Sequence, residues 1–235
     1  MPNYPINRRF VLKVAAFATL LAALPQVVYG FFLKRFPVRT VENKGFSFDS
    51  SSGIYKDRQG REAPFQLVVN GLVEKPLRLS WRELNDLPQV EQVNDFHCVE
   101  GWSVPDLKWG GVKPGYLLAM AGIKKQASHV VFHALGETRH KPGGLKYYVE
   151  CNSIDELKDP AKQMLLAHSL NGSPLPLEHG APLRLISPFD LAYKSIKFVW
   201  RLEVTDSAVE GWWTRANPIY PYEAPVPPER LRKKS

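Results

Sequence analysis

The apolar segments of this chain are short and are separated by proline and glycine, which excludes a bundle of long helices. The 235-residue sequence contains 20 prolines and 16 glycines. Segments such as 129–134 and 146–151 are rich in β-branched and aromatic residues and have the length of strands. Helix signals are brief: a Ser-x-x-Glu capping pattern occurs at 80–83 and again at 153–156. We therefore predict a β-rich α+β fold in a single domain.

The same patterns predict the positions of the main elements. Strands are expected at 65–69, 89–96, 129–134, 146–151, 183–187 and 196–204, with a short buried strand or helix at 164–167. Asn70-Gly71 predicts a tight hairpin whose return strand begins at Leu72. A helix is expected over 114–121, ended by Gly122, whereas 40–63 and the proline-rich carboxyl end are expected to be irregular.

The formal net charge of +8 is concentrated at the two ends of the chain. Residues 1–39 carry six basic side chains and no acidic one, residues 229–235 form a basic tail, and the body between them is close to neutral. Nucleic-acid binding needs clustered basic residues on the folded domain, so nucleic acid is not expected as a partner. We divide the chain into a signal or anchor (1–39), the main domain (40–228) and the tail (229–235), and assign the excess charge to targeting and to the membrane surface.

The amino terminus has the layout of an export signal. Arg8-Arg9 is followed by Phe10 and Lys13, and an apolar run of 20 residues extends from Val14 to Leu33. This arrangement resembles the twin-arginine signal of bacterial export, which carries already folded proteins. No Ala-x-Ala cleavage sequence ends the run, which is long enough to span about 30 Å of hydrocarbon. We expect export to the periplasm or the outer face of the inner membrane, with an uncleaved membrane tether as a compatible outcome.

The stretch around Cys98 carries the strongest chemical signal. Cys98 follows His97 at the end of an expected strand, and Glu100-Gly101-Trp102 follows it. Three chemistries remain open from the residues alone: a nucleophilic thiolate, a disulfide to Cys151, or a thiolate ligand to a metal. Adjacent strand residues point to opposite faces, so His97 is badly placed as a base for Cys98.

The residues at 96–103 resemble the molybdenum-binding domain of the sulfite oxidase family, in which one cysteine thiolate ligates the molybdenum of molybdopterin. Cys-Val-Glu-Gly-Trp-Ser at 98–103 is similar to the branch that contains the catalytic subunit of the periplasmic methionine sulfoxide reductase. Three more stretches agree in order: 109–112 resembles a turn after the cysteine strand, 179–185 a segment that contacts the cofactor, and 188 with 193–197 a segment that closes over the pterin phosphate. The resemblance spans about 65–206 and implies a sulfite-oxidase-like molybdopterin-binding fold.

The resemblance implies a set of site residues. Cys98 corresponds to the metal ligand, and Arg184 offers a planar fork suited to phosphate. Lys194, with the backbone N–H groups around Tyr193 and Ser195, completes the expected anion site.

Three further positions are implied less directly. His179 stands where the branch often has asparagine, so a ring N–H replaces an amide there, and Asn43 matches an early pterin contact. Lys197 ranks below Lys194 as a phosphate ligand. His133-Ala134 stands where the branch has a threonine near the cofactor, so its hydroxyl is missing.

The resemblance also implies a reaction, a two-electron oxygen-atom transfer with molybdenum-molybdopterin as the cofactor. Sulfite oxidases place arginines just after the cysteine, whereas this chain has Gly101, Trp102 and Ser103, so we expect reduction of a sulfoxide or N-oxide on a small molecule or a protein. With no Cys-x-x-Cys-His haem motif, the electrons must come from a separate redox partner, for which a haem membrane protein is the candidate. The alternatives are a sulfite-oxidising enzyme of the same family, a cofactor-free binding module and a cysteine-dependent hydrolase.

Overall fold

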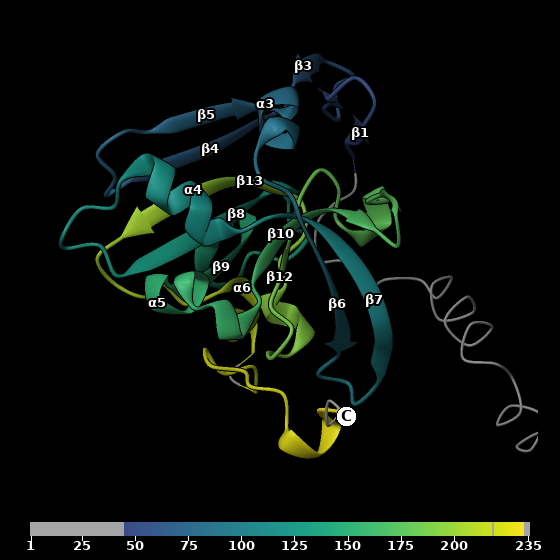
Figure 1. Cartoon of the computed structure of the whole chain (residues 1–235), viewed down its shortest axis with the longest axis vertical. Coiled ribbons are helices and arrows are strands. Elements are labelled where there is room, and N and C mark those ends of the chain that lie inside the picture. Colours follow the sequence, from purple (N-terminus) through teal and green to yellow (C-terminus); the bar gives the residue numbers. More distant parts are fainter. Residues whose placement is uncertain (1–44, 218, 233–235) are drawn as a thin grey trace, which may run out of the picture. The chain divides into compact units, whose positions relative to one another are not determined.

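The computed structural model describes residues 45–217 and 219–232, and within them strands form two five-stranded sheets and one three-stranded sheet (Figure 1). Asn43 and the predicted export signal lie outside the described residues. No helix of the described part is long and apolar enough to cross a membrane. The sheet-rich architecture with few, short helices confirms the predicted fold class.

The first five-stranded sheet collects strands from both ends of the domain. Its order is β5 (Leu77–Ser80), β4 (Gln66–Gly71), β13 (Val199–Thr205), β8 (His129–Glu137) and β9 (Tyr147–Ser153). The β13–β4 pair is parallel and the other pairs are antiparallel. The predicted hairpin at Asn70-Gly71 is therefore wrong: β4 pairs with β5 across a longer connection, and Leu72 N–H instead donates to Val204 O at 2.8 Å.

The second five-stranded sheet carries the Cys98 region. Its path is β11 (Ser173–Pro174), β10 (Leu165–Leu170), β7 (Ser103–Val112) and β6 (Val90–His97), and β12 (Arg184–Ile186) also pairs with β10. The β6–β7 hairpin is long and curved (Figure 1). Residues 109–112, predicted as a turn, are the end of strand β7. Gly111 permits this pairing, because a Cβ there would overlap the carbonyl oxygen of Leu166 on β10.

Residues 45–64 are more regular than predicted. They contain a three-stranded antiparallel sheet of β1 (Ser47–Asp49), β2 (Ile54–Lys56) and β3 (Glu62–Pro64). Its strands are only three residues long and rich in polar residues, so they show no alternation of apolar and polar positions by which they could be predicted.

The helices are short, and two of them begin as predicted. They are α3 (Trp81–Asp86), α4 (Pro114–Ala121), α5 (Ile154–Lys158) and α6 (Trp212–Ala216), with single 3-10 turns η1 (Pro142–Gly144), η2 (Pro160–Lys162), η3 (Leu177–His179), η4 (Ala192–Lys194) and η5 (Pro228–Arg230). Complete capping boxes at Ser80 and Ser153 begin α3 and α5, and Gly122 ends α4 with φ +65°.

Two buried clusters lie on opposite faces of the second sheet. Leu166 and Leu185 face the main core, which they share with residues of the first sheet and of α3–α5. Leu165, Ala167 and Ile186 face a smaller cluster with Trp109. Successive strand residues point to opposite faces, so Arg184, two residues before Ile186, projects toward the smaller cluster. This placement brings Arg184 to the inner face of the Cys98 hairpin.

Candidate functional site

Cys98 lies in the turn that joins β6 to β7. Its N–H donates to Trp102 O at 2.9 Å, and Gly101 N–H donates to Cys98 O at 3.1 Å. Gly101 has φ +93°, a conformation that glycine adopts without strain. Cys98 is partly exposed, and neither Cys98 nor Cys151 forms a disulfide. The disulfide alternative is thus not realised in the structure, and Cys151 is a buried thiol on β9.

His97 is hydrogen-bonded to Ser103, which agrees with the expectation that it is badly placed as a base for Cys98. It is buried, and its Nδ1 lies 2.8 Å from Ser103 Oγ across the hairpin. Burial, reinforced by the charge of Arg230, holds the pKa of His97 below its ordinary value. A neutral ring bonded to Ser103 fixes the base of the turn.

The turn exposes two large apolar side chains beside the carboxylate of Glu100. The exposed fractions of Val99 and Trp102 are 37% and 46%, high for such side chains. Trp102 Nε1 donates to Glu100 Oε2 at 3.4 Å. The thiol therefore lies beside an exposed rim made of Val99 and Trp102.

Arg184 is held from three directions within reach of this hairpin. It is 5% exposed, and its Nε donates to Ser195 O at 3.2 Å while Nη1 donates to His179 O at 3.1 Å. Its guanidinium carbon lies 4.5 Å from the centre of the Phe96 ring, two residues before Cys98, and 6.0 Å from that of Trp109. The strand that leads to Cys98 and the segments around His179 and Ser195 thus meet at one buried cation.

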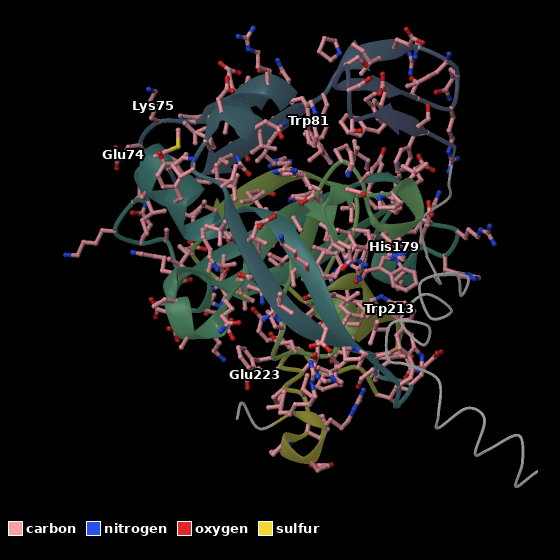
Figure 2. All side chains as sticks on the ribbon, turned by 45° about the vertical axis from the view of Figure 1, so that its right-hand side comes forward. Glu74, Lys75, Trp81, His179, Trp213 and Glu223 are labelled. Atoms are coloured by element: carbon pink, nitrogen blue, oxygen red, sulfur yellow. The ribbon has the colours of Figure 1, made fainter. Side chains whose placement is uncertain are left out.

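A second buried cation, Lys197, contacts the loop around His179. Lys197 Nζ donates to Glu178 O at 2.9 Å, and a Cβ on Gly180, at φ +116°, would touch the Lys197 side chain. Ser195 Oγ accepts a hydrogen bond from Ser187 N–H at 3.0 Å. Figure 2 labels His179 on the side of the domain opposite Glu74.

Lys194 and Tyr193 point elsewhere. Lys194 Nζ donates to Glu150 Oε1 at 2.6 Å and to Cys151 O at 2.7 Å, and it lies 4.5 Å from the centre of the Tyr222 ring. Tyr193 OH donates to a backbone carbonyl at 2.7 Å. In this structure, these two side chains anchor the segment that precedes Ser195 instead of facing Arg184. Lys197, ranked lower from the sequence, is the lysine beside the His179 loop.

His133, at the position where the resembling branch of the family has a threonine, also has a hydrogen-bond partner. Its Nε2 lies 2.9 Å from Glu203 Oε2 on the neighbouring strand β13. Burial, together with the nearby Arg201 charge, holds the pKa of His133 below its ordinary value.

The residues at this place fit an anionic metal cofactor. The described residues contain no group of three or more His, Cys, Asp or Glu that could hold a metal ion, so a metal at Cys98 needs further ligands from a cofactor or solvent. Within the described residues, Trp109 Nε1 is buried without a hydrogen-bond partner close to Arg184, leaving a donor available to an acceptor. A soft thiolate at a partly exposed turn, with two buried cations and an aromatic N–H, matches a metal bound by an anionic group.

Sequence reasoning missed three contributors to this place. Phe96 and Trp109 stack on Arg184, and Arg230 contacts the Cys98 turn. Phe96 and Trp109 alternate correctly for the inner face of their strands, a signal that was present. Arg230 comes from the segment interpreted as membrane-proximal charge, and in the structure both Arg230 and Arg232 bind the domain itself.

Comparisons with known proteins agree with this geometry. A family model described as the oxidoreductase molybdopterin-binding domain matches residues 55–213. YuiH of Bacillus subtilis, named an uncharacterised oxidoreductase, is 36% identical over 152 residues, covering 64% of this chain and 70% of YuiH. The protein-methionine-sulfoxide reductase catalytic subunit MsrP of Gluconobacter oxydans is 34% identical over 175 residues, covering 71% of this chain and 55% of MsrP.

A solved structure shares the fold. The sulfane dehydrogenase SoxCD from Paracoccus pantotrophus superposes with a TM-score of 0.54 at 23% identity, covering 71% of this chain and 46% of that chain. The chain thus spans about half the length of MsrP and of this SoxCD chain. The predicted fold is confirmed, and the chain belongs to the sulfite oxidase family of oxidoreductases with a molybdopterin-binding domain.

Proposed function

We propose that this protein is a molybdenum-molybdopterin enzyme that reduces a neutral sulfoxide or N-oxide, with Cys98 as the thiolate ligand of the metal. The observation that carries the proposal is the placement of one partly exposed thiol two residues after Phe96, whose ring packs on the buried Arg184 guanidinium, and beside the exposed side chains of Val99 and Trp102. The bound cofactor supplies the two-electron oxygen-atom transfer, while the residues around it hold and orient the reactants.

The anionic part of the cofactor is assigned to the loop and strand residues that meet at Arg184. Arg184 and Lys197 supply the positive charge, and Ser195 and His179 supply polar groups from the segments that these cations hold. Tyr193 and Lys194 position the segment from the side of β9. Asn43 is kept as a cofactor contact on the resemblance alone.

The rim supports a neutral substrate. Val99 and Trp102 present apolar surface, whereas a sulfite dianion would need cationic side chains with free donors. Arg230 brings a cation to this turn, where three of its five N–H groups donate to protein oxygens. Named relatives such as MsrP act as methionine-sulfoxide reductases, which agrees with this substrate class.

The reaction balances with an external reductant. A sulfoxide takes up two electrons and two protons and yields a thioether and water. The electrons come from a separate redox partner, for which we keep a haem protein of the membrane. Export by the twin-arginine route to the periplasm, with a retained membrane tether as the alternative, agrees with such a partner and with loading of the cofactor before export.

Metal content and turnover test the proposal together. The chain is expressed with the molybdopterin pathway, and molybdenum is measured in wild type, Cys98→Ala and the matched control Cys151→Ala, whose thiol is buried on β9. We expect about one molybdenum per chain, reduction of methionine sulfoxide with reduced viologen, and no sulfite oxidation. Cys98→Ala loses turnover and Cys151→Ala retains it. Absence of molybdenum from folded wild type, or sulfite oxidation without sulfoxide reduction, contradicts the proposal.

A further inference from the structure

The carboxyl-terminal residues 221–232, called the strap here, connect two separate parts of the candidate site. The strap lies at the foot of the domain, where Figure 1 shows it next to the tip of the β6–β7 hairpin and Figure 2 labels its Glu223. It follows residue 213, the last residue matched by the family model, so the family match does not assign it a role.

The first half of the strap is built into the domain beside the segment that precedes Ser195. Leu191 N–H donates to Ala224 O at 2.7 Å, and Val226 N–H donates to Phe189 O at 2.8 Å. Ala224 and Val226 are 2% and 3% exposed. These two hydrogen bonds form an isolated antiparallel β-bridge between Asp190 and Pro225.

The second half reaches the Cys98 turn through Arg230. Its Nη1 donates to Cys98 O at 2.9 Å, and its Nη2 donates to Trp102 O at 2.7 Å and to Ser103 Oγ at 3.0 Å. Cys98 O and Trp102 O are also the acceptors of the hydrogen bonds that close the turn. One planar guanidinium therefore binds the two carbonyls that close the turn, those of Cys98 and Trp102, and also the Ser103 hydroxyl that is hydrogen-bonded to His97.

Arg232 attaches the end of the strap to both strands of the hairpin. Its guanidinium pairs with Asp95 on β6 and with Asp106 on β7. Partial burial acts to raise the pKa of Asp95, but hydrogen bonds from Arg232 and from Asp106 N–H hold it below its ordinary value. The strap thus contacts the hairpin at its turn and along its strands.

We propose that the strap is a positioning element of the Cys98 site, in which Arg230 sets the conformation of the turn and thereby the orientation of the thiolate toward the metal. The inference rests on the proposed function for the metal, but not for the effect on the turn. Gly101 leaves the turn intrinsically free, and a fixed cation bound to both carbonyls removes that freedom.

Hydrogen exchange of the turn tests the inference without the metal. Exchange of peptides that cover 95–103 is compared in wild type, Arg230→Ala, Arg230→Lys and the charge-matched control Arg82→Ala, whose side chain is 92% exposed on α3. We expect the Cys98 and Gly101 amides to exchange about tenfold faster in Arg230→Ala, since the charged hydrogen bonds to the carbonyls of Cys98 and Trp102 and to Ser103 Oγ are lost. Arg82→Ala leaves them unchanged, and Arg230→Lys, which keeps the charge without the planar fork, lies between.

The metal-loaded protein gives the second readout. In Arg230→Ala and Arg230→Lys we expect an altered electron paramagnetic resonance signal of the molybdenum and a lower kcat, because the thiolate ligand is reoriented when the turn is no longer fixed. Unchanged exchange in both Arg230 variants overturns the strap proposal, whatever the metal content. Faster exchange in a chain that binds no molybdenum retains the strap and contradicts the proposed function. If Arg230→Ala does not fold, the Arg230→Lys comparison decides.

Discussion

Breaking the buried Lys194–Glu150 ion pair is expected to destabilise the protein strongly. The Nζ–Oε1 distance is 2.6 Å, and the two side chains are only 4% and 1% exposed. Lys194→Met leaves the carboxylate buried without its partner, which costs about 3–5 kcal/mol of the free energy of unfolding. Total stabilities are about 5–15 kcal/mol, so this single change removes a large part of it.

The cost should depend on pH in a defined direction. Burial raises the pKa of Glu150, and Lys194 opposes that rise. In Lys194→Met the folded-state pKa of Glu150 is raised further. This variant is therefore least destabilised at and below the ordinary carboxyl pKa, loses stability as pH rises toward the raised folded-state pKa, and shows its full cost above that value.

Urea unfolding of the full chain measures both effects in a double-mutant cycle. The double variant Glu150→Gln/Lys194→Met is expected to be more stable than Lys194→Met, because no buried charge remains. Lys108→Met is the matched control: its pair with Glu91 is 2.8 Å long, but the side chains are 47% and 62% exposed, so its loss costs less than about 1 kcal/mol. A cost for Lys194→Met no greater than this control, or an additive cycle, would refute the reasoning.

Three further changes probe other parts of the structure. His97→Gln should reduce the loss of stability on acidification. Burial and the charge of Arg230 lower the pKa of His97 from 6.5, so the unfolded chain binds the proton more tightly than the folded one and wild type loses stability as pH falls through this range. Urea unfolding at about pH 5 and about pH 7.5 measures this loss, and an equal loss in wild type and His97→Gln would speak against the argument. Gly111→Ala should cost about 1–3 kcal/mol, because its Cβ overlaps the Leu166 carbonyl, and a thermal midpoint equal to wild type would show that the strands can separate there. Arg184→Lys should retain molybdenum poorly after gel filtration, since one ammonium cannot replace the planar fork, and full retention would remove Arg184 from the cofactor site.

Much of the fold was predictable because local signals and tertiary structure agree. The capping boxes at Ser80 and Ser153 and the stop at Gly122 act within one helical turn, so their effects do not depend on distant residues. The hairpin predicted at Asn70-Gly71 failed for the opposite reason. The backbone after Gly71 bonds to β13, more than a hundred residues away, and a local turn motif carries no information about that pairing.

The candidate site was predictable where residue chemistry alone restricts the role. Cys98 and Arg184 were identified by type and context, and the structure brings their strands together. The choice of lysine could not be made from sequence, because the backbone of 192–197 turns between Lys194 and Lys197 and sends the two side chains to different partners. The role of Arg230 could not be predicted, since Arg230 and the Cys98 that it contacts are 132 residues apart in the sequence and the segment around Arg230 has the composition of a solvated tail.

The ligand sphere of the metal tests the central claim most directly. Molybdenum X-ray absorption of the loaded protein counts the sulfur ligands in wild type, Cys98→Ser and Cys151→Ser. The account predicts that Cys98→Ser loses one sulfur ligand, whereas Cys151→Ser, with its thiol buried on β9, matches wild type. An unchanged sulfur count in Cys98→Ser would contradict it, because Cys98 would then not bind the metal.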